Sequence, residues 1–118
     1  MIDKDTDELD QVFAALANKR RRQIVYELGL QPASIGLLAQ RQQLSLPAIH
    51  RHIQVLESAR LIQRKKVGRV NFLAINRSRL LLMQEWVHQY HAYWGTDKET
   101  LENYVAGIEK DENNLKEN

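Results

Sequence analysis

The sequence contains no cysteine among its 118 residues. This absence excludes a disulfide framework, thiolate metal ligands, a cysteine nucleophile and a redox switch built on thiols. Long apolar runs are also missing, because the longest strongly apolar stretch, residues 80–83, is far shorter than the roughly 20 residues of a membrane span. The first residues are acidic, unlike the basic start of a secretory signal peptide. We therefore expect a cytoplasmic protein with no membrane partner.

Motifs for catalysis are missing as well. The sequence has no glycine-rich phosphate loop, no Gly-x-Ser-x-Gly elbow and no paired carboxylates in the middle of the chain. We therefore expect neither an enzyme nor a bound cofactor.

Acidic residues are nearly absent from the middle of the chain. Residues 13–96 carry thirteen Lys and Arg against three Glu, a net charge of +10. Residues 1–12 and residues 97–118 each have a net charge of −4. A basic body between acidic ends is typical of a protein that binds a polyanion. Ordinary solvated surface charge is the alternative.

Helical periodicity dominates the rest of the chain. We expect helices over about 8–17 and 19–29, a short one starting at Ser34, another starting at Ser45, and further helices over about 77–94 and 97–109. The β-forming residues between Leu61 and Ile75, interrupted by Gly68, predict a two-stranded hairpin. The expected fold is mainly α with a small β-hairpin, in the order α-α-α-α-β-β-α-α, over a single domain of residues 1–118. The final helix is acidic.

This order of elements predicts a winged helix-turn-helix domain. The helix that starts at Ser45 would enter the major groove of double-stranded DNA, and the basic hairpin would contact phosphates or the minor groove. Side chains that can donate or accept hydrogen bonds stand on the exposed face of that helix. The candidate DNA-binding residues are Ser45, Pro47, Ala48, His50, Arg51, His52 and Gln54 on this helix, and Arg64, Lys65, Lys66 and Arg69 in the hairpin.

Three segments resemble the ArsR family of winged-helix repressors. Residues 13–24 (FAALANKRRRQI) are similar to the family's opening, residues 44–62 to its recognition helix, and residues 67–72 to its wing. His52 and Leu56 fall on a His and a Leu that are usual there. The resemblance, from about Asp10 to Trp94, implies a homodimeric repressor that binds a palindromic operator. His50 stands where the family has a small hydroxyl residue, and Arg60 where a glycine is common.

A long helix with an aromatic stripe usually needs a partner to cover it. We expect the helices over about 8–17 and 77–94 to form the dimer. The candidate interface residues are Val12, Phe13, Leu80, Met83, Trp86, Val87, Tyr90 and Trp94. The aromatic row could instead line a ligand pocket.

A metal site is the less favoured use of the same helix. Glu85, His88 and His91 could supply carboxylate and imidazole ligands for zinc, but the family's Asp-x-His pair is absent. The sequence resembles the branch of the family without metal sites, and we expect no metal. The alternatives in function are a repressor that responds to a metal or a small molecule at helix 77–94, and a winged-helix module that binds protein. The sequence identifies no effector.

Overall fold

The computed structural model describes residues 4–90 and 96–117. The chain forms two compact units, residues 1–86 and residues 87–118, which we call the winged unit and the C-terminal unit. From the sequence we expect a single domain over residues 1–118. Among the described residues, no helix is long and apolar enough to span a bilayer.

The winged unit begins with four helices. These are α1 (Lys4–Leu16), α2 (Lys19–Leu30), α3 (Ile35–Gln42) and α4 (Leu46–Ser58). The side chains of Asn18, Ser34 and Ser45 cap α2, α3 and α4, each accepting a hydrogen bond from a backbone N–H in the first turn. The predicted starts of these helices are confirmed, including Pro47 in the first turn of α4.

The turn between α3 and α4 is tight because Gln43 has a left-handed backbone, with φ of 54°. The Gln43 N–H donates to the Gln40 carbonyl and the Leu44 N–H donates to the Ala39 carbonyl. This pair of hydrogen bonds is a Schellman motif, which ends α3 at once. The turn thereby sets the two helices of the helix-turn-helix against each other.

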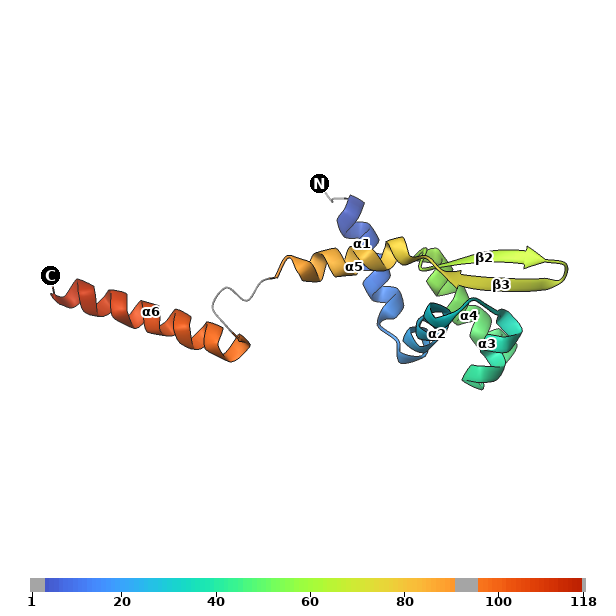
Figure 1. Cartoon of the computed structure of the whole chain (residues 1–118), viewed down its shortest axis with the longest axis horizontal. Coiled ribbons are helices and arrows are strands. Elements are labelled where there is room, and N and C mark those ends of the chain that lie inside the picture. The colour runs from blue at the N-terminus through green and yellow to red at the C-terminus, as the bar shows by residue number, and fades with distance from the viewer. Residues whose placement is uncertain (1–3, 91–95, 118) are drawn as a thin grey trace. The chain divides into compact units, whose positions relative to one another are not determined.

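A hairpin of β2 (Ile62–Val67) and β3 (Val70–Ile75) follows α4, and Figure 1 shows its tip reaching past the helices. Gly68 lies in the two-residue turn with φ of +62°, a conformation that glycine adopts without strain. The sheet also has a third strand, β1 (Ala33–Ser34), which pairs with β3 in the order β1-β3-β2. The expectation of two strands was therefore incomplete, because a two-residue strand is too short to have a sequence pattern.

One hydrophobic core holds the winged unit together. Apolar side chains from α1, α2, α3, α4, β2 and β3 meet in it, and α4 contributes its inward stripe at positions i, i+4 and i+7. The most deeply buried large side chains are Val12, Ile24, Leu38, Ile49, Ile53, Leu56, Leu61 and Leu73. With this stripe covered, the polar face of α4 is turned to solvent.

The last two helices differ from the predicted bounds. Helix α5 (Arg77–His88) ends before the expected residue 94, and the Tyr90 N–H donates to the Val87 carbonyl in a closing turn. Most helical stability in proteins comes from packing, and Trp86, Val87 and Tyr90 are all exposed. Helix α6 (Asp97–Glu117) continues past the expected residue 109, because no glycine or proline follows in residues 110–117.

Candidate nucleic-acid interface

Helix α4 presents one exposed polar face, which we call the reading face: His50, Arg51 and Gln54. All three side chains are exposed, while Ile49 and Ile53 beside them are fully buried. Arg and Gln are side chains that form paired hydrogen bonds with base edges in the major groove. The reading face therefore has the chemistry that recognition of base sequence needs.

The residues at the start of α4 have a different place. The Ser45 hydroxyl accepts a hydrogen bond from the Ala48 N–H at 3.3 Å, so Ser45 caps the helix. Pro47 is exposed and Ala48 half-buried, which leaves this first turn open to a backbone that approaches α4. These three residues thus lie next to the reading face, and of their side chains only the exposed Ser45 hydroxyl can still donate a hydrogen bond.

His52 is half-buried between α4 and the start of α2. Burial is the main cause that lowers the pKa of His52, and the positive charges of Arg21, Arg20 and Arg51 lower it further. His52 is therefore neutral near pH 7. It lies among cations rather than on the reading face, although the sequence grouped it with the DNA-binding residues.

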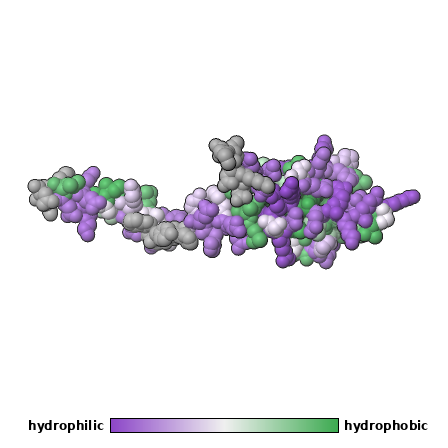
Figure 2. Space-filling model, turned by 90° about the horizontal axis from the view of Figure 1, so that it is seen from above, coloured by the Kyte–Doolittle hydropathy of each residue, from purple (hydrophilic) through white to green (hydrophobic). Residues whose placement is uncertain are grey.

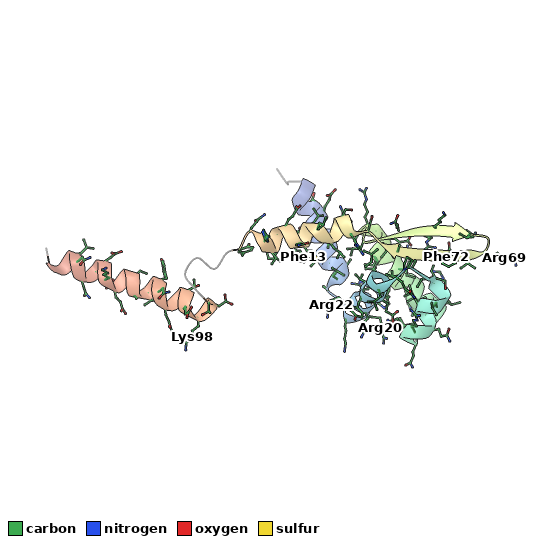
Figure 3. The ribbon with its side chains drawn as sticks, viewed as in Figure 1. Phe13, Arg20, Arg22, Arg69, Phe72 and Lys98 are labelled. Carbon is green, nitrogen blue, oxygen red and sulfur yellow. The ribbon has the colours of Figure 1, made fainter. Side chains whose placement is uncertain are left out.

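The hairpin carries its cations on both faces. Lys65 is paired across the strands with Phe72, and Lys66 with Asn71, so the two lysines point to opposite sides. Both are exposed, and Arg69 lies at the tip of the hairpin (Figure 3). Cations on a projecting two-stranded ribbon can contact phosphates whichever base sequence they flank.

Arg64 has a different role from the other hairpin cations. Its guanidinium binds the Glu57 carboxylate of α4 through two hydrogen bonds, Nη2 to Oε1 at 2.6 Å and Nε to Oε2 at 3.2 Å. A paired Arg of this kind is partly neutralised and held in place. Arg64 thus also has a structural role, because this ion pair fixes the hairpin against α4, and its contact with DNA stays a prediction.

The arginines at the start of α2 hold the neighbouring helices. The Arg21 guanidinium donates to the carbonyls of Ala14 and Ala15, and the Arg22 guanidinium donates to the Leu16 carbonyl. These carbonyls end α1, where cationic donors are favourable. Figure 3 shows Arg20 and Arg22 near the start of α2. The sequence indicated only a basic patch, since charge patterns do not reveal which carbonyls a guanidinium binds.

Arg20 makes the corresponding bond to α3. Its Nη1 donates to the Gln42 carbonyl at 2.9 Å, which ties the start of α2 to the end of α3. Some of the cationic side chains of the winged unit thus donate hydrogen bonds to its own backbone carbonyls.

The predicted dimer residues fall into three groups. Val12 is fully buried in the core of its own chain, so its expected place in an interface is corrected. Phe13 and Trp86 pack edge to face, with ring centroids 5.5 Å apart, and join α1 to α5. Leu80 and Met83 are half-buried, whereas Val87 and Tyr90 are exposed. Trp94 lies outside the described residues.

The candidate metal ligands do not form a described site. Glu85 and His88 are exposed on α5, and His91 lies outside the described residues. Within residues 4–90 and 96–117, no three His, Asp or Glu side chains are placed to share a metal ion.

The core, the tight turn between α3 and α4, the exposed face of α4 and the hairpin together define a winged helix-turn-helix protein. No protein-family model matches the chain. The crystal structure of an ArsR family transcriptional regulator is 30% identical to this chain, with a TM-score of 0.68 over 75% of this chain and 91% of that one. The chain belongs to the ArsR family of transcriptional regulators.

Two other proteins are similar to this chain, one in sequence and one in fold. The HTH-type transcriptional regulator Rv2034 of Mycobacterium tuberculosis is 39% identical over 59 residues, about half of each protein (50% of this chain and 55% of the relative). A homodimeric winged helix-turn-helix DNA-binding domain from Mycobacterium bovis has a TM-score of 0.61 at 24% identity, over 77% of this chain and 90% of that one. The second likeness concerns the fold alone.

Proposed function

We propose that this protein is a sequence-specific DNA-binding regulator of transcription that acts as a homodimer and represses by occupying a palindromic operator. The observation that carries the proposal is the reading face of α4, which is exposed, free of acidic residues and backed by a fully buried stripe. A helix of this kind fits the major groove of B-DNA. A regulator of this kind works where the genome is, so we expect it in the cytoplasm.

In this proposal, recognition of the base sequence and general affinity for DNA depend on different residues. Arg51 and Gln54 would bind base edges and thereby select a sequence. Lys65, Lys66 and Arg69 would bind phosphates, which adds affinity without selecting a sequence. Figure 2 shows hydrophilic side chains over most of the visible surface of the winged unit, in keeping with a polar interface. The ion pair of Arg64 and Glu57, whose side chains are 33% and 32% exposed, would keep the hairpin at a fixed angle to α4.

A homodimer would place two reading faces on one side of the DNA. We propose that α1 and α5 form its interface, because their packed pair of Phe13 and Trp86 leaves Trp86 39% exposed beside Leu81, which is 49% exposed. Burying apolar surface of this kind in a second copy stabilises a dimer. The winged helix-turn-helix domain from Mycobacterium bovis is itself homodimeric. Two recognition helices about 34 Å apart would then meet successive turns of the major groove.

The proposal is tested by selecting bound duplexes from a random DNA library with the full chain. We expect enrichment of a palindrome whose half-sites lie about one helical turn apart. The selected duplex should also bind with a steep salt dependence, with a slope of log K against log salt of about −4 to −7 if roughly four to eight phosphates are neutralised. A library without enrichment, or an affinity that salt does not change, would contradict the proposal and favour a protein-binding module.

A further inference from the structure

The C-terminal end of α4 is held by Asn76, which directly precedes α5, and by Arg79 in the first turn of α5. Three successive carbonyls accept hydrogen bonds there: Ala59 from Arg79 Nε at 3.1 Å, Arg60 from Asn76 Nδ2 at 3.0 Å, and Leu61 from the Asn76 N–H at 2.8 Å. These bonds join segments 15 to 20 residues apart in the sequence. The end of the recognition helix is therefore fixed to the first turn of α5.

Arg79 extends this connection to α1. Its Nη1 forms an ion pair with Glu8 Oε2 at 3.2 Å, with side chains that are only 10% and 25% exposed. Nε and Nη1 belong to one rigid, planar guanidinium, so the Ala59 carbonyl and the Glu8 carboxylate are held in a fixed relation to each other. A single buried side chain thus connects α4, α5 and α1.

Stability alone does not account for a guanidinium at this position. Arg79 is only 8% exposed, and its Nη2 is buried without a hydrogen-bond partner among the described residues. Burying an unsatisfied donor costs free energy, and apolar replacements of buried ion pairs are often neutral or stabilising. What an apolar side chain of similar length could not provide is the fixed connection between the three helices.

We infer that Arg79 is a positioning residue that sets the angle of the recognition helix against α1 and α5, and so sets the half-site spacing that the dimer accepts. This inference rests on the proposed function, in which α1 and α5 form the dimer and α4 reads DNA. One added base pair moves a half-site by about 3.4 Å and turns it by about 34° along the duplex. A dimer whose α4 is held rigidly should bind the duplex with the added base pair more weakly. A dimer whose α4 can tilt should bind both duplexes with similar affinity.

The test compares full-length variants on three probes: the duplex selected from the random library, the same duplex with one base pair added between the half-sites, and a duplex with a single half-site. Wild type should prefer the original spacing by about tenfold. Arg79→Met, which keeps the bulk of the side chain, should reduce this preference to about twofold. Arg79→Lys should reduce it as well, because one ammonium cannot replace the planar fork. Arg77→Met is the matched control, since Arg77 is exposed in the same turn of α5, and should behave as wild type.

Binding of the single half-site separates positioning from folding. We expect Arg79→Met to bind the single half-site as wild type does. The inference is overturned if Arg79→Met keeps the tenfold preference, or if it weakens all three probes by one common factor. Should Arg79→Met fail to fold by circular dichroism, Glu8→Gln decides instead: it should lower the preference, and an unchanged preference would overturn the inference. If the library yields no selected duplex, the proposed function fails before this test begins.

Discussion

The two units of the chain use amphipathic helices in opposite ways. In the winged unit, the apolar stripe of α4 is fully buried, with Ile49, Ile53 and Leu56 at 0% exposure. In the C-terminal unit, α6 has a stripe of similar spacing, yet Leu101, Tyr104, Val105, Ile108 and Leu115 are 42–76% exposed. Helical periodicity therefore predicts a helix in both units, but it does not reveal which stripe has something to cover it.

The two helices also depend on different interactions. Packing in the core stabilises α4, whereas the described contacts of α6 are local. The Thr96 N–H donates to Glu99 Oε2 at 2.8 Å and the Glu99 N–H donates to Thr96 Oγ1 at 3.3 Å, which is the predicted capping box. Lys98 and Glu102 add an exposed ion pair at 4.0 Å, one turn apart. Such contacts contribute only about 0.3–1.5 kcal/mol each.

Matched truncations in the two units test this contrast and have the largest expected effect. Ile53→Ala should lower the free energy of unfolding by about 2–5 kcal/mol, because it leaves a cavity in the core. Ile108→Ala, the same chemical change on the 42% exposed face of α6, should cost less than about 0.5 kcal/mol. Urea unfolding followed by circular dichroism measures both. Equal losses would contradict the contrast and indicate that another surface covers α6 in solution.

The winged unit also contains strained backbone, which a glycine should relieve by a smaller amount. Arg60 ends α4 with φ of 60°, and hydrogen bonds from Arg60 to Glu57 and from Leu61 to Leu56 form a Schellman motif around it. Arg60→Gly should raise the free energy of unfolding by about 1 kcal/mol, since a left-handed residue with a Cβ costs that much. Arg60→Ala, which keeps the Cβ, is the control and should give no gain. A loss of stability in Arg60→Gly would show that the added freedom of the unfolded chain outweighs the strain.

The positive charge of the winged unit should leave a small pH signature at His52. Burial and then the charges of Arg21, Arg20 and Arg51 lower the pKa of His52, so the unfolded chain binds this proton more readily than the folded one. The free energy of unfolding should therefore fall as the pH drops through the ordinary histidine value of about 6.5 toward the lowered pKa.

The difference between wild type and His52→Gln isolates this effect. Gln cannot take up the proton, so urea unfolding from about pH 7.5 to about pH 5.5 should cost wild type more free energy than the variant. Parallel pH profiles of the two proteins would mean that the surroundings of His52 do not favour its neutral form.

The sequence predicted features whose causes are local. The caps Asn18, Ser34, Ser45 and Thr96 and the hairpin turn at Gly68 all depend on residues within a few positions of one another, and all are confirmed. The order of helices and hairpin followed from them, as did the winged helix-turn-helix fold.

Features that depend on distant residues could not be predicted from the sequence. Arg79 binds the Ala59 carbonyl from 20 positions away, and Arg20 binds the Gln42 carbonyl from 22 positions away. In the sequence both are simply basic residues on helices. The ion pair of Arg64 with Glu57 could not be predicted either, because only the fold brings these two residues together. The exposure of the polar face of α4 could be predicted, because the spacing of its buried and polar residues is visible in the sequence itself.

The central claim is that the reading face of α4 recognises the base sequence, whereas the hairpin cations add affinity for any DNA. Comparing variants of these two sets of cations tests this claim most directly. Binding to the selected duplex and to a random duplex would be measured for Arg51→Ala and for the double variant Lys65→Ala with Lys66→Ala. Arg51→Ala should lose about 1–3 kcal/mol of discrimination between the duplexes, while the double variant should weaken both alike. An Arg51→Ala protein that binds both duplexes more weakly by the same factor would contradict the assignment of the reading face.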